Sequence, residues 1–570
     1  MWTGGRPVVQ KVLWWTGLLG IVAVGVALAA IKSENRRGLW LDEVYSLVLS
    51  RGEGYAHRGL PVDEPLDASP AELTRPPEAL KPLGVWRGQY ADSHPPLYFL
   101  LLHGWRWLLG GGAETARVLS LVLFGLAVAM TAAAARSLGA GRGGALVAAG
   151  VLAAAGPATW YAAEIRGYVL GMLLSAVMLW ALGRVVRRPG VLSGSLYVGS
   201  VVAMGLTHYF LAGVAAGAWA GAWLGAMVGA RDGRARALAA AGACAAVVYA
   251  LVWGGGLAAQ WAVREGFSGW ITEWGELPLW LAAVLATGAM SRVLGGPADF
   301  TGAASGLAIV AALVLATWRD RGRPWAWGMP MLLGGAAGAV LLPLASDLVL
   351  GSVHLFHVRY VLFAVVPLAV SGGLIWSLGG LWRGLGAAML GVALLGQLEP
   401  WATEGDWQSV GQAVERALDG GPGASGEATG LAFVVARADD VARRRDIETD
   451  VRLLAVLVEA NRVRERRVAR PVALTVLFEP AGEGLNVTEL AQRWPGVRRW
   501  VVVSAWRHGE GGGDIEGWWV RHVEVWPQMN VRLVVFERSG MRGSEGREGS
   551  AGGTPAVQPA RSSLSRSRAG

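Results

Sequence analysis

The chain has 570 residues, of which 53% are hydrophobic and only 16% are charged, and its mean hydropathy is +0.40. Soluble globular proteins carry about 25% charged residues, so this composition excludes an ordinary soluble protein and indicates a polytopic membrane protein with some soluble part. The formal net charge of +9 requires no nucleic-acid partner, because much of the excess arginine lies in short loops and in the C-terminal tail. The single cysteine, Cys244, excludes a disulfide within the chain.

Apolar segments recur from residue 12 to residue 399. A membrane-spanning helix needs about 20 apolar residues, although shorter ones occur in bundles. We predict eleven crossings: 12–31, 115–135, 143–162, 168–185, 191–207, 209–229, 237–255, 302–318, 325–346, 358–377 and 384–399. Two further stretches, 97–109 and 277–294, are ambiguous, and the first is short and interrupted by His103 and Arg106.

The positive charges of the loops favour one topology. Short basic loops occur at Arg136–Arg142, Arg184–Arg188, Arg231–Arg236, Arg319–Arg323 and Arg383. All five fall on the cytoplasmic side if 97–109 and 277–294 do not cross, as the positive-inside rule favours. We therefore predict eleven crossings plus two interfacial helices, in the inner or plasma membrane, with everything after about residue 400 outside the cytoplasm.

The sequence becomes more polar after Pro400. Four β-like runs, at 431–437, 472–478, 498–506 and 531–538, alternate with polar segments that include a charged helix near 440–467. Such alternation is typical of a small α/β domain. The predicted organisation is a transmembrane catalytic domain (1–400) whose first outer loop is 32–93, an extracytoplasmic α/β domain (401–538), and a disordered tail (539–570) rich in Gly, Ser and Arg.

Polar clusters that are costly at membrane depth all emerge on the predicted outer side. In chain order they are Asp42 and Glu43; Asp92 and His94; Glu164, Arg166 and Tyr168; His208; and His354, His357, Arg359 and Tyr360. Because ionisable groups near a bilayer are costly, this common location predicts that the clusters line one water-accessible cavity.

Each cluster also has a purely structural interpretation. Asp42 and Glu43 could be a solvated acid pair, Glu164 and Arg166 a structural ion pair, and His208 a hydrogen-bonded core histidine. His354 and His357 share one helical face, and with another histidine and an acid they could bind a metal. No compact ligand motif is present, so we assign no metal ligands and leave a divalent metal open.

Carboxylates that take a proton, together with Arg and His groups that hold an anion, suit group transfer from a lipid phosphate. A base activates the acceptor hydroxyl, and positive groups offset the charge that develops on the departing phosphate. Arginine can grip such a phosphate with two donors.

Several motifs carry a resemblance to a known family. "LWLDEVYSLVLS" (39–50) resembles the first-loop acidic signature of GT-C membrane glycosyltransferases. "DSHPPLYFLLLHGW" (92–105) and "AEIRGYVLGMLL" (163–174) resemble the next two motifs of bacterial glycosyltransferase family 39, which includes relatives of protein O-mannosyltransferases and of the aminoarabinose transferase of lipid A. "RYVLFAVVPLAV" (359–370) and "DWQSVGQAVERAL" (406–418) resemble its later segments.

The resemblance implies a GT-C fold and transfer of a hexosyl or pentosyl group from a polyisoprenyl-phosphate donor to a glycan, lipid or protein hydroxyl on the outer face. It implies that Asp42 is the catalytic base, with Glu43 supporting it. Donor-site candidates are His94, Glu164, Arg166 and Tyr168, with Arg117 as a further phosphate contact or a plain helix anchor. From their position on the same outer side we add five donor- or phosphate-binding candidates: His208, His354, His357, Arg359 and Tyr360.

Two other classes compete with an enzyme. A transporter or flippase of a lipid-linked or anionic substrate would also have many spans and buried charges, but its site usually lies near the midplane between repeated halves. A structural anchor for the C-terminal domain leaves the outer clusters unexplained. The clustering at one face and the lack of repeated halves in the sequence favour the glycosyltransferase.

Overall fold

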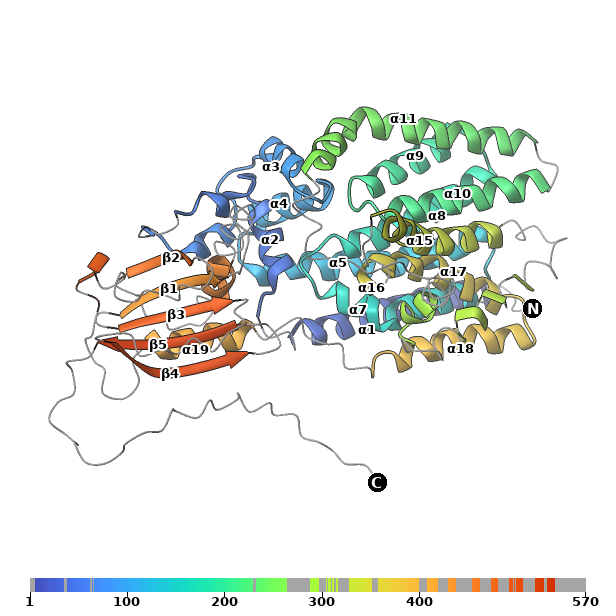
Figure 1. Ribbon diagram of the computed structural model, residues 1–570. Coiled ribbons are helices and arrows are strands. Elements are labelled where there is room, and N and C mark those ends of the chain that lie inside the picture. The colour runs from blue at the N-terminus through green and yellow to red at the C-terminus, as the bar shows by residue number, and fades with distance from the viewer. Residues whose placement is uncertain are drawn as a thin grey trace, which may run out of the picture. The chain divides into compact units, whose positions relative to one another are not determined.

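The computed structural model describes most of the helical part of the chain and the strands of the C-terminal part (Figure 1). The described residues are 6–34, 38–61, 64, 66–228, 232–263, 288–296, 328–350, 357–398, 407–418, 429–436, 454–461, 473–479, 499–505, 518–526 and 531–538, with short pieces within 304–315 and 492–497. The chain divides into two compact units, which are described separately. Unit 1 comprises Met1–Asn35 and Pro76–Trp401, and unit 2 comprises Arg36–Arg75 and Ala402–Gly570.

Unit 1 is built from helices. Among the described residues, six stretches are long and apolar enough to cross a membrane: α1 (Arg6–Glu34), α5 (Ala113–Leu138), α8 (Tyr168–Arg187), α11 (Asp232–Val263), α15 (Gly328–Leu350), and the continuous α16 (Val358–Val361), η5 (Leu362–Ala364) and α17 (Val365–Trp376). A seventh candidate is the pair α6 (Arg142–Ala154) and α7 (Gly156–Ala162), bent by 62°. Shorter apolar helices are α9 (Val191–Gly205), α10 (Leu211–Val228) and α18 (Leu381–Leu395). The chain is thus a mostly helical, multi-pass membrane protein.

The predicted crossings map onto these helices unevenly. Six of the eleven predicted segments correspond to the six long stretches, and 143–162 corresponds to the bent pair. Three others, 191–207, 209–229 and 384–399, correspond to the shorter apolar helices. The segment 302–318 and the ambiguous stretch 277–294 lie largely outside the described residues. The count of eleven crossings therefore stays a prediction.

Helix α4 (Leu97–Leu109) follows Pro95-Pro96 and has one buried face. Tyr98, Phe99, Leu102, His103 and Arg106 are buried, whereas Leu101 and Leu108 are exposed. A helix of 13 residues rises about 20 Å, less than the roughly 30 Å of a bilayer core. The helix alone is therefore shorter than the bilayer core, and the interfacial position of 97–109 stays a prediction.

The break between α6 and α7 has its polar groups satisfied by neighbouring helices. Pro157 lies at the start of α7 and removes a backbone donor there. The Lys32 ammonium donates to the Gly156 carbonyl at 3.1 Å and to the Thr159 hydroxyl at 2.8 Å, and Gln397 Nε2 donates to the Ala154 carbonyl at 2.7 Å. Freed backbone groups at membrane depth need such partners.

Helices α10 and α15 pack side by side through glycines (Figure 1). A Cβ atom built at Gly217 would lie 2.0 Å from the carbonyl oxygen of Gly334, and one at Gly213 would lie 2.2 Å from that of Gly338. Only residues without a side chain allow backbones to approach so closely, which is a common way of packing membrane helices.

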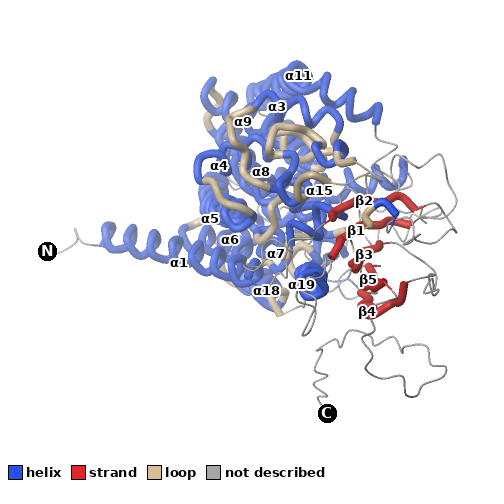
Figure 2. Tube along the Cα trace, turned by 90° about the vertical axis from the view of Figure 1, so that its left-hand side faces the viewer, coloured by secondary structure: helices blue, strands red, loops and turns tan. Residues whose placement is uncertain are grey.

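Unit 2 contains a five-stranded mixed sheet (Figures 1 and 2). Its strands are β1 (Thr429–Ala436), β2 (Ala473–Glu479), β3 (Arg499–Ala505), β4 (Trp518–Trp526) and β5 (Val531–Arg538), in the order β2-β1-β3-β5-β4. Strand β1 pairs in parallel with β2 and β3, whereas β5 pairs antiparallel with β3 and β4. Helix α19 (Trp407–Leu418) packs on β1, β3 and β5. Strand β4 lies in a segment for which the sequence analysis predicts no strand.

The first part of the predicted outer loop also belongs to unit 2. It forms α2 (Leu41–Leu49), η1 (Ala56–Gly59) and η2 (Pro70–Thr74). Hydrogen bonds join it to the C-terminal residues: among them, Ser69 Oγ donates to Glu459 Oε2 at 2.9 Å, and Thr475 Oγ1 donates to the Glu64 carbonyl at 2.9 Å. The predicted C-terminal domain, 401–538, does not include this part of the first loop. The predicted boundaries at 400 and 538 stay predictions.

Candidate active site

A carboxylate, an imidazole and a guanidinium lie in a row in unit 1. His94 follows η3 (Gln89–Ala91), and its Nδ1 is 3.5 Å from Oδ2 of the buried Asp92 and 3.0 Å from the Ser93 hydroxyl. On the other side of the ring, Nε2 is 3.2 Å from Nη2 of Arg166. Because a guanidinium only donates, Nε2 accepts, and the ring proton is on Nδ1. His94 is therefore oriented from both sides.

Aromatic rings surround the next member of the cluster, His208, which lies in the turn between α9 and α10. Its ring centroid is 6.3 Å from that of His94, 5.9 Å from that of Tyr168 and 6.3 Å from that of Tyr360. Phe210 and Phe363 complete the surround at 5.7 and 5.2 Å. We call His94, Arg166, Tyr168, His208 and Tyr360 the unit 1 cluster; its members come from four separate segments of the chain.

Three other predicted donor-site residues of unit 1 are buried: Arg117, Glu164 and Arg359. The Glu164 carbonyl accepts a hydrogen bond from Ser120 Oγ of α5 at 2.6 Å, which ties the turn before α8 to α5. Arg117 is buried on α5, and the guanidinium carbon of Arg359 lies 5.1 Å from the ring centroid of Tyr360. His357 is exposed, with its ring 6.0 Å from that of Tyr360. His354 lies outside the described residues.

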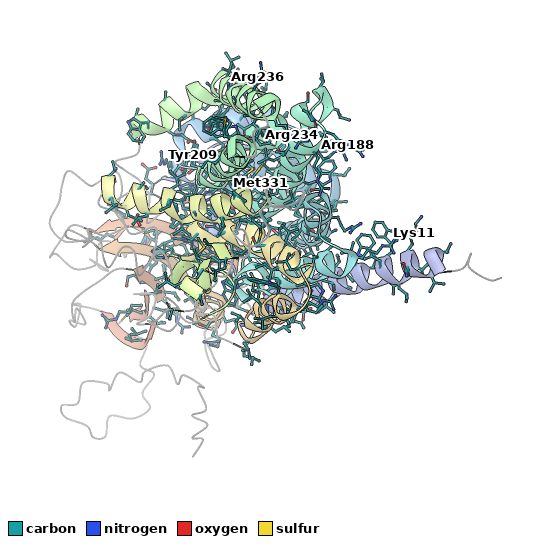
Figure 3. The ribbon with its side chains drawn as sticks, turned by 90° about the vertical axis from the view of Figure 1, so that its right-hand side faces the viewer. Lys11, Arg188, Tyr209, Arg234, Arg236 and Met331 are labelled. Carbon is teal, nitrogen blue, oxygen red and sulfur yellow. The ribbon has the colours of Figure 1, made fainter. Side chains whose placement is uncertain are left out.

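A polar strap from α11, formed by Gln260, holds the segment that carries His94, and Gln260 is not among the residues predicted from the sequence. Gln260 Nε2 donates to two backbone carbonyls, those of Gln89 at 2.6 Å and of His94 at 3.0 Å. The Gln260 side-chain oxygen accepts from the Tyr209 hydroxyl, which itself accepts from Trp253 Nε1 at 3.1 Å (Tyr209 is labelled in Figure 3). One side chain therefore joins α11, the turn between α9 and α10, and the segment that ends in His94.

The surroundings of the strap raise the pKa of Tyr209, which lies between α9 and α10. Burial raises the pKa of this phenol to about 12, the hydrogen bond from Trp253 partly offsets the rise, and the negative charge of Asp92 adds to it. The phenol is therefore neutral at physiological pH and donates its proton to Gln260.

Asp42 and Glu43 lie in the first turn of α2, in unit 2. Asp42 is half-buried. Glu43 is buried, and its Oε2 accepts from the backbone N–H of Trp40, the residue before the helix, at 3.4 Å. Glu43 thus helps to cap the helix that presents Asp42.

The structure groups no three His, Cys, Asp or Glu side chains as metal ligands within the ranges that it describes.

Comparisons with known proteins give resemblances at the level of structure. No family model matches the sequence, and no curated protein matches it. Among solved structures, ArnT from Cupriavidus metallidurans bound to undecaprenyl phosphate shares 14% identity at a TM-score of 0.39, over 92% of this chain and 98% of its own. The Archaeoglobus fulgidus oligosaccharyltransferase tethered with an acceptor peptide shares 10% identity at a TM-score of 0.41, over 86% and 69%.

The arabinofuranosyltransferase AftD from Mycobacteria shares 16% identity at a TM-score of 0.32, over 91% of this chain and 41% of its own. All three are GT-C glycosyltransferases, and the resemblance predicted from the sequence motifs is confirmed as a resemblance. All three TM-scores lie below 0.5.

Proposed function

We propose that the protein is a membrane glycosyltransferase that moves a sugar from a polyisoprenyl-phosphate donor to an acceptor hydroxyl on the outer face of the membrane. The observation that supports this most is the unit 1 cluster, in which Arg166, oriented against His94, lies among Tyr168, His208 and Tyr360. It combines a cation for a phosphate with ring faces and hydroxyl groups for a sugar.

The cation is suited to a phosphate because it is held in place. Arg166 is buried except for 6% of its surface, and Nε2 of His94 fixes one of its nitrogens at 3.2 Å. A guanidinium carries five N–H donors in a planar fork, a geometry that matches phosphate oxygens. A preorganised cation at the departing phosphate stabilises the charge that develops there.

The sequence resemblance assigns the role of general base to Asp42. Asp42 lies half-buried in the first turn of α2, where its carboxylate is partly open to solvent. The acceptor O–H proton passes to the Asp42 carboxylate, the acceptor oxygen bonds to the anomeric carbon, and the bond from that carbon to the phosphate oxygen breaks. The products are the glycosylated acceptor and the polyisoprenyl phosphate. General-base help is worth about 10²–10⁴ in rate.

Binding of undecaprenyl phosphate to the purified protein tests the phosphate role. Arg166→Ala removes a charge-assisted contact worth about 1.5–3 kcal/mol, so its affinity should fall about 10- to 100-fold. The matched control is Arg188→Ala, since Arg188 is an exposed arginine that follows α8. Equal affinities in both variants would contradict the proposal.

Sugar transfer tests the base. Mass spectrometry of lipid that copurifies with the protein identifies the sugar of the donor, which is then used in a transfer assay. Asp42→Asn should abolish transfer and leave binding of undecaprenyl phosphate unchanged. Full transfer activity in this variant would exclude Asp42 as the base.

A further inference from the structure

A buried asparagine from the C-terminal part of the chain contacts the backbone directly before α2. Asn461 is the last residue of the described helical stretch 454–461, and only 1% of its surface is exposed. Its Oδ1 accepts from the N–H of Leu39 at 2.7 Å, and its Nδ2 donates to the carbonyl of Leu39 at 3.0 Å. All four groups are buried, and the two residues are 422 positions apart in the chain.

This contact holds both backbone hydrogen-bonding groups of Leu39, its N–H and its C=O. An amide side chain matches a backbone N–H and C=O only in one orientation, so the pair sets position and direction together. Nδ2 also donates to the Leu457 carbonyl at 2.9 Å, which orients the Asn461 side chain from its own helical stretch. Removing the amide would leave two buried backbone groups without these partners, and such groups are costly.

Gly38 provides an independent sign that the backbone is pinned at this point. Its φ of +93° is disfavoured for residues with a side chain. A Cβ atom there would lie 2.4 Å from Oδ1 of Asn461 and 2.8 Å from the backbone nitrogen of Gln408 in α19. The chain therefore enters α2 between two helical segments of the C-terminal part, with no space for a side chain.

The position of Leu39 determines that of Asp42 through the first hydrogen bonds of α2. The Trp40 carbonyl accepts from the N–H groups of Glu43 and Val44 at 3.0 and 3.1 Å, and the Trp40 N–H donates to the Glu43 carboxylate. Val44, Leu47 and Val48 are fully buried on the next turns of the helix. Leu39 therefore sets where α2 begins, and Asp42 lies three residues beyond it.

We propose that Asn461 is a positioning residue for Asp42: by holding both backbone groups of Leu39, it sets the start of α2 and thereby the direction of the Asp42 carboxylate. This inference rests on the proposed function, in which Asp42 is the base. It makes the C-terminal residues part of the catalytic apparatus without any contact of their own with substrate.

The test compares Asn461→Leu and Asn461→Asp with Ser69→Ala. Ser69 also joins the first loop to the helical stretch 454–461, through Glu459, but its hydrogen bond does not involve the backbone at the start of α2. Both Asn461 variants should lower kcat for sugar transfer at least 10-fold and change the KM for the lipid-linked donor less than about 2-fold. Asp keeps the size of Asn and still accepts from the Leu39 N–H but cannot donate to its carbonyl, so it separates the lost donor from lost packing.

A second readout does not depend on activity. Amide hydrogen exchange of residues 39–44 should accelerate in both Asn461 variants and stay at the wild-type rate in Ser69→Ala. Wild-type exchange of this segment in the Asn461 variants would overturn the inference. So would a wild-type kcat, or a loss of kcat that Ser69→Ala shares.

The failure of this inference is distinguishable from that of the proposed function. If Asp42→Asn abolishes transfer and both Asn461 variants stay fully active, only the positioning role is wrong. If Asp42→Asn keeps full activity, the base assignment is wrong, and the positioning role falls with it.

Discussion

The glycine contact between α10 and α15 makes a quantitative prediction. In Gly217→Ala the new Cβ would lie 2.0 Å from the Gly334 carbonyl oxygen, whereas real Cβ contacts rarely fall below 3.0 Å. The two helices must therefore separate by at least about 1 Å, the difference between these distances. Overpacking of this kind costs about 1–3 kcal/mol, because the neighbouring contacts open as well.

The assay is the thermal unfolding of purified protein in detergent at one scan rate. Gly217→Ala should lower the transition temperature by about 1–3 °C, because the unfolding entropy of a chain of this length is about 1.2 kcal/mol/K. The matched control is Gly199→Ala, since a Cβ at Gly199 on α9 meets nothing within 4 Å. There, alanine favours the helix by about 0.5–1 kcal/mol, so the transition should stay or rise slightly. A transition of Gly217→Ala at or above that of Gly199→Ala would refute the reasoning.

Two further predictions concern the strap of α11. Gln260→Leu deprives two backbone carbonyls of their donor, so it should lower the free energy of unfolding by about 2–4 kcal/mol and weaken binding of undecaprenyl phosphate. The control Gln10→Leu removes only an exposed contact with Arg142 and should have neither effect. Equal thermal transitions of the two variants would contradict the role of Gln260. Because the pKa of Tyr209 is raised to about 12, its contribution to stability is complete below pH 10 and is lost as the pH rises through 12. The wild type should therefore lose more stability than Tyr209→Phe over that interval, and identical pH profiles would exclude the shift.

The helices of unit 1 could largely be predicted, because long apolar runs are a strong signal in the sequence. The segment 143–162 looks like one span, yet the chain breaks at Ala155, and a second helix with Pro157 in its first turn begins at Gly156. Strand β4 was missed because "WWVRHVEVW" (518–526) places charged residues and a histidine among its apolar ones, so it resembles a polar connection. This segment forms a strand because it pairs with β5, and such pairing depends on the tertiary structure and not on the local sequence.

The members of the unit 1 cluster could be predicted because each is an ionisable or aromatic residue at the end of an apolar run. Gln260 and Asn461 could not, since each binds backbone groups, which every sequence contains at every position. A single amide at the end of a long helix has no periodic signal. Glu43 shows a third case: the acid pair is visible in the sequence, but the bond from Trp40 N–H to Glu43 follows only from the helix start.

The bond between Asn461 and Leu39 constrains how the polypeptide threads the bilayer. Two groups that touch must lie on one side of it, so the chain traverses the bilayer an even number of times between positions 39 and 461. The ten crossings predicted after the first are an even number. The hydrogen bonds to Leu39 therefore support this number by an argument that does not use the basic loops. A protein in which one of those spans failed to insert would leave the two residues separated by the lipid, and α2 would have no anchor at its start.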